Sequence, residues 1–404
     1  MRFSNKTYGL VSALGLFLCT SAILVASGQE PSQQQRPRRV GTSDNAQPAK
    51  GAPADATVDV IDEGDVVRVD TQLVSVPAVV LNSEGRPLPG LNMENFQLFE
   101  NGKEQKIANF ATTETPFEIA LLLDTSGSTR ADVALIRHAA NAFVEALRPG
   151  DRVAIVGFNT ARRDGSTLAT PEVLSKLTGD RRELRQAIER LGSSNGTPFY
   201  DGLSRIADEI FFDAPREEMR GRRALVALTD GVDSASDAEF QNVRLKLVRG
   251  GVASYFVQVN TEDFVEERLL RDCGDEGAVV LSRKQLERYR RNFFPRARRE
   301  DFVDFCDMGS FERMKISRDL YNLARREMND MAKATGGNNF LAATLQDARA
   351  AFARVANEIG TQYSLGYYPA NKARDGSFRA IRVAVKGVPA QAQVRAREGY
   401  YAPK

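Results

Sequence analysis

The middle of the chain, from about residue 116 to 342, alternates short apolar runs with longer amphipathic segments. Apolar side chains recur at helical spacing in the amphipathic segments, of which 132–147 and 198–211 are the clearest. The apolar runs have the length of buried strands, and they lie at 117–123, 152–158, 224–229 and 252–259. Strands separated by helices pair in parallel, because each helix carries the chain back to the start of the next strand. The pattern predicts an α/β fold with a doubly wound, mostly parallel sheet over 116–345.

Two segments with a different pattern flank this region, at 66–115 and 346–404. In both, apolar residues alternate with polar ones as in half-buried strands, and 346–404 opens with one further helix. Asn101-Gly102 lies next to such a run and predicts a tight hairpin turn. Neither segment has enough strands to be stable alone. We therefore expect the two to pair into one small β-domain, with the central domain inserted between them.

The N-terminus has the features of an export signal. A charged start precedes an uncharged, mostly apolar run that ends near Ala26, and small residues follow. We expect cleavage near Gly28, so that 1–28 is a signal peptide, with an uncleaved membrane anchor as the alternative. Residues 29–65 are rich in Gln, Pro, Ala and Asp and predict a disordered spacer. The protein is therefore expected to be secreted or located in the periplasm or cell envelope, and to lie at a membrane only if the signal is kept.

The stretch 261–332 is longer than the connection expected between the last predicted strand and the next helix. It begins with acidic residues, and a basic run from Arg283 to Arg299 follows. Opposite charge blocks indicate an insert that folds on itself, with a solvated helix face and a partner-binding surface both open as its role. Without the signal, the remaining cysteines are Cys273 and Cys306. In an oxidising compartment this pair favours a disulfide, with two isolated thiols as the alternative.

Two of the predicted strands end in loops that carry a carboxylate. Asp124 follows the first strand, with hydroxyls after it at Ser126 and Ser128, and Asp230 follows the third strand. Ligands of such sheets bind at the carboxyl ends of the strands, so we expect these oxygens to converge. Oxygen ligands with few negative charges suit Mg²⁺, whose other positions stay open to water or an outside group. The single histidine, His138, excludes a zinc site built from several histidines.

This arrangement resembles the metal-ion-dependent adhesion site of the von Willebrand factor type A domain, which has an Asp-x-Ser-x-Ser motif, a later Thr and a later Asp. Asp124, Ser126 and Ser128 match the first element, and Asp230 matches the last. For the middle element we choose Thr197, which opens a predicted helix and could instead be only its N-cap. The resemblance implies that these five residues hold Mg²⁺, or else Mn²⁺ or Ca²⁺. It also implies binding instead of catalysis, because an Asp or Glu carboxylate of a partner protein fills the metal's vacant position. The flanking β-segments further resemble a secreted acidobacterial subgroup of this family.

Other interpretations stay open beside the non-enzymatic binding protein. Each loop taken alone could be only a helix cap or a turn, and the metal site could serve only to stabilise a structural scaffold. An aspartyl phosphatase of the haloacid dehalogenase type also presents an Asp at the end of a strand, but it needs a second Asp where this chain has Ser126. Neither motif serine lies in Gly-x-Ser-x-Gly, which disfavours a serine hydrolase. Lys+Arg 55 and Asp+Glu 53 nearly balance, so we expect no nucleic acid partner.

Overall fold

The computed structural model describes residues 73–112, 115–127, 133–163, 165–213, 222–296, 298 and 304–404. The predicted signal peptide (1–28), the predicted spacer (29–65) and Ser128 lie outside these residues. Every helix in the described ranges is too short or too polar to cross a lipid bilayer.

A six-stranded sheet forms the centre of the α/β part, in the order β10-β9-β8-β5-β6-β7. Its strands are β5 (Glu118–Leu123), β6 (Arg152–Arg163), β7 (Ser166–Thr178), β8 (Arg223–Thr229), β9 (Val252–Val259) and β10 (Asn338–Ala342). Neighbouring strands are parallel except β6 and β7, which are antiparallel. The predicted α/β class with a mostly parallel sheet is confirmed.

The hairpin of β6 and β7 has no counterpart among the predicted strands. The apolar run 152–158 continues as β6 to Arg163, and β7 returns beside it at the edge of the sheet. Most of β7 is exposed or half-buried, and polar residues interrupt its apolar ones. It therefore lacks the continuous apolar run by which a buried parallel strand is recognised in a sequence.

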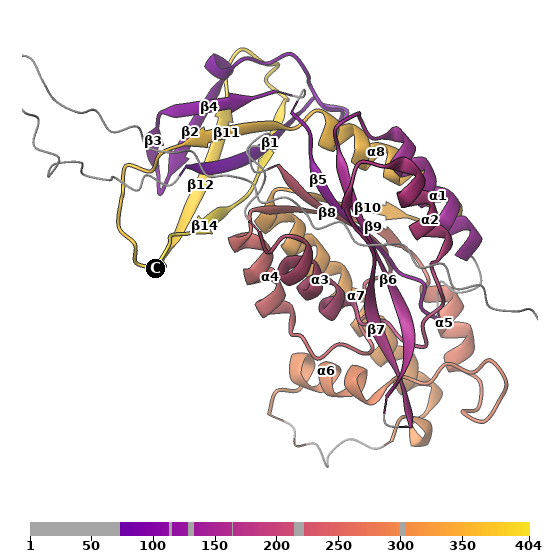
Figure 1. Ribbon diagram of the computed structural model, residues 1–404. Coiled ribbons are helices and arrows are strands. Elements are labelled where there is room, and N and C mark those ends of the chain that lie inside the picture. The colour runs from indigo at the N-terminus through magenta and orange to yellow at the C-terminus, as the bar shows by residue number, and fades with distance from the viewer. Residues whose placement is uncertain are drawn as a thin grey trace, which may run out of the picture. The chain divides into compact units, whose positions relative to one another are not determined.

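Helices cover both faces of the sheet (Figure 1). One face is covered by α1 (Val133–Ala146), α2 (Arg181–Glu189) and α8 (Ala348–Gly360), and the other by α3 (Phe199–Arg205), α4 (Phe240–Arg249) and α7 (Ser310–Thr335). Within β5, Leu121 packs in the first core and Leu122 in the second. Successive side chains of a strand point to opposite faces, which explains why this buried strand is apolar from Ile119 to Leu123. The predicted helix 198–211 is α3 with one π-helical turn, Ile206–Ile210, after it.

The flanking segments form two four-stranded antiparallel sheets. The first has the order β13-β1-β11-β4, with β1 (Val74–Leu81), β4 (Ile107–Ala111), β11 (Tyr363–Tyr367) and β13 (Gln393–Ala396). The second has the order β14-β12-β2-β3, with β2 (Phe96–Glu100), β3 (Lys103–Gln105), β12 (Phe378–Val385) and β14 (Gly399–Tyr401). A short 3₁₀ turn, Met93–Asn95, precedes β2. Each sheet combines strands from both ends of the chain, and the two sheets share one apolar core, so the predicted β-domain from the two segments is confirmed.

The predicted hairpin at Asn101-Gly102 is also present. It joins β2 to β3, which pair antiparallel. Asn101 has a φ of 47° and Gly102 a φ of 81°. Two successive positive φ values are what a tight hairpin of this kind requires, and Asn and Gly adopt them at low cost.

Arg222, which precedes β8, joins three separate parts of the chain. Its guanidinium donates to the carbonyls of Thr112 (3.0 Å) and Thr115 (2.6 Å), where the first β-segment leads into β5. It also donates to the carbonyl of Gln362 (2.8 Å), just before β11. The side chain is buried, and its guanidinium carbon lies 4.0 Å from the centre of the Phe117 ring.

The predicted insert is helical. It contains α5 (Glu262–Leu269), α6 (Arg283–Phe293), a 3₁₀ turn (Phe305–Asp307) and most of α7, so its predicted limit at 332 falls inside a helix. A disulfide joins Cys273 to Cys306, as expected. Buried apolar side chains from all of these helices form a separate small core. A 3₁₀ turn, Leu345–Asp347, leads from β10 into α8.

Candidate metal centre

Three loops meet at the carboxyl end of the central sheet. One follows β5 and carries Asp124 and Ser126, one precedes α3 and carries Thr197, and one follows β8 and carries Asp230. Backbone hydrogen bonds fasten the loops together: Ser194 donates to the Thr125 carbonyl (3.0 Å), and Ser234 to the Thr197 carbonyl (3.0 Å). The Thr197 N–H in turn donates to Ser234 Oγ (2.8 Å). The order of strands in the sheet thus brings together residues that lie far apart in the sequence.

Asp124 is fully buried at the end of β5. Its Oδ1 accepts a hydrogen bond from the Ser126 N–H (2.9 Å), and its Oδ2 accepts one from Thr229 Oγ1 (2.6 Å). Burial and the neighbouring Asp230 carboxylate nevertheless raise the pKa of Asp124 to about 7. These hydrogen bonds favour the ionised form, but they do not offset the loss of water and the like charge beside it.

Asp230 is the second buried carboxylate of the site. Its Oδ1 accepts from the Val232 N–H (3.0 Å), and its Oδ2 accepts from Thr261 Oγ1 (2.7 Å). Thr261 Oγ1 also lies 2.7 Å from the hydroxyl of Tyr321 on α7. Burial and the charge of Asp230 hold the pKa of Tyr321 well above its usual value, so its phenol stays protonated. A chain of hydroxyls therefore connects Asp230 to the insert.

Thr229 links the two carboxylates through the backbone of the loop after β8. Besides donating to Asp124, its Oγ1 accepts from the Gly231 N–H (2.9 Å). Gly231 has a φ of 78°, and a Cβ there would lie 2.4 Å from the terminal carbon of Met328. The sequence Thr-Asp-Gly after an apolar strand thus encodes a turn that only glycine fits without strain, with a hydroxyl on one side and a carboxylate at its start.

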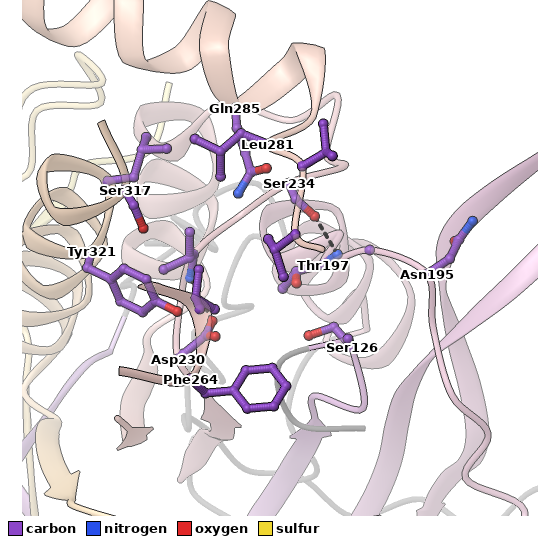
Figure 2. Close-up of a pocket in the computed structure, with 17 residues that line it drawn as sticks. Ser126, Asn195, Thr197, Asp230, Ser234, Phe264, Leu281, Gln285, Ser317 and Tyr321 are labelled. Atoms are coloured by element: carbon purple, nitrogen blue, oxygen red, sulfur yellow. Dashed lines mark hydrogen bonds between the residues drawn. The ribbon is translucent and has the colours of Figure 1, made fainter. Parts of the chain in front are cut away.

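Figure 2 shows three of the five predicted site residues around one pocket. Ser126, Thr197 and Asp230 line the pocket, and the oxygens of Ser126 and Asp230 point toward each other across it (Figure 2). Asp124 accepts from the Ser126 backbone beneath them. The fifth residue, Ser128, lies outside the described residues. The structure therefore brings together Asp124, Ser126, Thr197 and Asp230.

Sequence reasoning missed several contributors to this site. Thr229 could have been found, because it stands next to Asp230 at the carboxyl end of a strand. Thr261 follows the end of β9 by two residues, so the sequence indicated it more weakly. No pattern in the sequence pointed to Tyr321, since it comes from α7, 60 positions after Thr261, whose hydroxyl it contacts. The single histidine, His138, is exposed on α1 and does not line the pocket.

The pocket measures about 160 Å³ and has a second wall that comes from the insert. That wall is mostly apolar and consists of Phe264, Val265, Val279, Val280, Leu281 and Leu320, with Gln285, Ser317 and Tyr321 among them. Val232, from the loop after β8, lies in the lining as well. The site is therefore a partly enclosed hollow between the loops of the sheet and the helices of the insert.

The donor set fits an oxygen-preferring divalent cation. Two buried carboxylates lie close enough for one to raise the pKa of the other, and a cation between them would relieve that repulsion. Hydroxyls supply the remaining protein oxygens, as hard cations such as Mg²⁺ prefer. In the described part of the chain, no group of three or more His, Cys, Asp and Glu side chains could hold a metal ion by itself. The candidate site thus depends on hydroxyl ligands beside its two carboxylates.

The comparison with known proteins identifies the central part of the chain. A sequence model of the von Willebrand factor type A domain matches residues 119–232, which include Asp124, Ser126, Thr197 and Asp230. The match ends before the insert begins. A search of curated proteins found no match.

Solved structures of low similarity were also found. The conserved hypothetical protein BatB from Bacteroides thetaiotaomicron is 14% identical with a TM-score of 0.37, over 60% of this chain and 98% of that one. A von Willebrand factor type A protein from Catenulispora acidiphila is 11% identical with a TM-score of 0.39, and the match covers 83% of this chain and 76% of that one. Proximal thread matrix protein 1 from the mussel byssus, with a zinc-occupied MIDAS motif, is 15% identical with a TM-score of 0.38. The match covers 65% of this chain and 50% of that one. Such scores are too low to carry an argument about this chain.

The predicted acidobacterial subgroup stays a prediction, because none of these matches bears on it. The family model, in contrast, matches the strands and loops that build the site. It covers α3 and the strands β5, β6, β7 and β8. These four strands are neighbours in the central sheet, in the order β8-β5-β6-β7. By this match, the chain carries a von Willebrand factor type A domain.

Proposed function

We propose that this protein binds a partner protein by capturing one of its Asp or Glu carboxylates on a divalent cation. Mg²⁺ is the expected ion, with Mn²⁺ or Ca²⁺ as alternatives, and Asp124, Ser126, Ser128, Thr197 and Asp230 are its proposed ligands. The observation that carries the proposal is the pairing of two buried carboxylates, Asp124 and Asp230, of which Asp230 lines a pocket. Two carboxylates neutralise a divalent cation without surplus charge, and hydroxyl ligands leave it electrophilic toward one more anion.

Binding without catalysis is the proposed mode of action. Hydrolysis by the haloacid dehalogenase route would need an acid two residues after Asp124, where Ser126 stands. The sole histidine, His138, is exposed on α1 and does not line the pocket. These features support a site that holds a cation and an anion without a general acid to protonate a leaving group.

An extracytoplasmic location belongs to the same proposal. The disulfide between Cys273 and Cys306 supports it, because such bonds persist in oxidising compartments. We propose that the protein is secreted or held in the periplasm or cell envelope, where a protein partner with exposed acidic residues is its target. We propose no role in nucleic acid binding.

Calorimetric titration of the full chain with Mg²⁺ and Mn²⁺ tests the site. Asp124→Ala is expected to abolish cation binding, whereas Asp330→Ala, at an exposed position of α7, leaves it unchanged. Equal affinity in the wild type and Asp124→Ala would overturn the assignment of the site.

A second experiment tests the capture of a partner. Proteins from the native extracellular or envelope fraction are retained on the immobilised chain with Mg²⁺ and with chelator, and Asp124→Ala serves as the control. We expect a partner that is lost both with chelator and with the variant. A cation that raises the melting temperature while no acidic partner depends on it would favour the alternative of a structural scaffold.

A further inference from the structure

The pocket at the candidate metal centre has two chemically different walls. The loops of the sheet supply hydroxyl and carboxylate oxygens through Ser126, Thr197 and Asp230. The insert supplies apolar side chains, among them Phe264 and Leu281, which are labelled in Figure 2. A ligand that reaches the cation therefore has to lie against the insert as well.

The apolar wall is held in place by the insert's own packing. Its residues Val265, Leu281 and Leu320 belong to a buried core that also contains residues of α6 and α7. Ser282, the N-cap of α6, donates through Oγ to the Ser234 carbonyl (2.6 Å), and Ser234 accepts the hydrogen bond from the Thr197 N–H. The wall is thus fastened to one of the loops that carry the proposed ligands.

Arg288 forms a second attachment of the insert. Its guanidinium donates to the hydroxyl of Tyr200 on α3 and to the carboxylate of Glu327 on α7. The Tyr200 hydroxyl also donates to Glu327 (2.5 Å). Because Arg288 and Glu327 are largely removed from water, this ion pair resists solvent screening better than a surface pair would. The wall is therefore part of the site's geometry in the absence of ligand.

The upper part of the pocket also offers a hydroxyl. Ser317 on α7 is 2% exposed, and its Oγ has no hydrogen-bond partner among the described residues. Figure 2 shows this hydroxyl pointing into the pocket. An unpartnered buried hydroxyl lowers stability, and a polar group of a ligand would satisfy it.

We infer that the pocket selects an acidic residue of the partner that has a branched aliphatic neighbour. The inference rests on the proposed function and names the class of partner sequence. The carboxylate binds the cation beside Asp230, the aliphatic side chain lies on the wall formed by Phe264, Val280 and Leu281, and a backbone amide of the same segment reaches Ser317. A pocket of about 160 Å³ admits side chains of this size and is too small for a typical drug-sized ligand.

Three capped peptides separate the two parts of this recognition. Acetyl-Leu-Asp-Leu-amide has both the carboxylate and aliphatic neighbours, acetyl-Ala-Asp-Ala-amide has only the carboxylate, and acetyl-Leu-Asn-Leu-amide has only the aliphatic neighbours. Binding to the full chain is measured by calorimetry with saturating Mg²⁺ and with chelator. We expect the first peptide to bind about tenfold more tightly than the second, from the burial of one leucine side chain. We expect the third to show no Mg²⁺-dependent binding.

Two substitutions test the apolar wall. Val280 is 48% exposed and lines the pocket, so Val280→Ser should fold normally and reduce the preference for leucine over alanine at least threefold. Leu341→Ser is the matched control, because Leu341 on β10 is 66% exposed and does not line the pocket. It should leave the preference unchanged. The melting temperatures of both variants verify that they are folded.

Ser317→Ala tests the hydroxyl. It should weaken both aspartate peptides by a similar factor, without lowering the melting temperature. Unchanged affinity for both peptides would overturn the role given to Ser317.

The outcomes separate this inference from the proposed function. If the two aspartate peptides bind equally and both require Mg²⁺, carboxylate capture stands and the selection of an aliphatic neighbour is wrong. A preference for leucine that Val280→Ser leaves intact also overturns the assignment to this wall. If no aspartate peptide requires Mg²⁺, the proposed function fails and the inference fails with it.

Discussion

Asp124 and Asp230 are buried side by side, which is unfavourable for a protein without a bound cation. The hydrogen bonds from Ser126 and Thr229 stabilise the ionised form of Asp124, yet its pKa still rises to about 7. A buried group that is hard to ionise is costly to keep unless it has a function. At the scale of single residues, the strained pair is the clearest mark of a site that a cation completes.

This strain predicts how the stability of the cation-free protein depends on pH. The pKa of Asp124 is about 7 in the folded state, against an ordinary value of 3.8. Between these values the folded protein binds more protons than the unfolded one, so its free energy of unfolding falls as the pH rises from about 4 to about 7. The fall is on the order of 4 kcal/mol for one carboxyl.

Chemical denaturation in chelator across this pH range measures the effect. Asp124→Asn should remove most of the fall, and saturating Mg²⁺ should also suppress it in the wild type, because the cation binds the ionised form. A wild type whose stability in chelator is constant from pH 4 to 7 would contradict the prediction.

Sequence and structure agree at this scale where a residue lies next to a recognisable strand end. Asp124 and Asp230 are predictable for that reason, since both follow strands that are mostly apolar. Tyr321 could not be predicted, because its contact with Thr261 depends on how the insert packs. Local sequence identifies the ligands, whereas packing determines what surrounds them.

At the scale of the elements, the insert is the part that sequence reasoning described least well. The basic run Arg283–Arg299 left a solvated helix and a binding surface open. In α6 one arginine, Arg288, turns inward to Tyr200 and Glu327, while Arg283 pairs with Glu287 on the exposed side. Charge alone could not separate the two roles, because the same residue type serves both within one helix.

The disulfide should matter to the insert more than to the cation site. It closes a loop of 33 residues in a small core, so its loss is expected to cost about 3 kcal/mol. The double variant Cys273→Ser, Cys306→Ser should therefore show faster amide hydrogen exchange in α5 and α6. Cation affinity should change little, since neither cysteine lines the pocket.

Hydrogen exchange and calorimetric titration of the same samples check both parts of this prediction. The wild type treated with a reductant is the matched control, and it should resemble the double variant. Exchange in α5 and α6 that is as slow as in the oxidised wild type would show that the insert is stable without the bond.

At the scale of the whole molecule, the chain ends form one β-domain and the middle forms another domain. The paired strands were predictable from two observations, period-two alternation at both ends and too few strands in either. The edge hairpin β6–β7 was not, because its mostly exposed second strand lacks an apolar run. The contacts between the two domains could not be predicted either, because a buried arginine cannot be told from an exposed one in a sequence.

Arg222 makes one of these connections, beside others such as the hydrogen bond from the Glu398 N–H to the Ala334 carbonyl, and its loss should weaken the coupling of the two parts. Burial lowers its pKa to about 9, and it stays charged near neutral pH as it donates to the carbonyls of Thr112, Thr115 and Gln362. Arg222→Met keeps most of the aliphatic length against Phe117 but leaves these carbonyls without their donor. The buried Gln362 carbonyl that loses a charged donor costs about 1.5–3 kcal/mol, and the more exposed Thr112 and Thr115 carbonyls add less, so we expect a destabilisation of at least about 1.5 kcal/mol.

The form of the unfolding curve distinguishes a connection from an ordinary buried contact. If Arg222 couples the β-segments to the central sheet, the wild type should unfold in one calorimetric transition and Arg222→Met in two. Arg223→Met is the matched control, because Arg223 is also buried but pairs with Glu118 within the central sheet. It should lower the melting temperature while keeping a single transition. A single transition in Arg222→Met would show that other contacts suffice to couple the parts, since the coupling then survives without the guanidinium that spans all three segments.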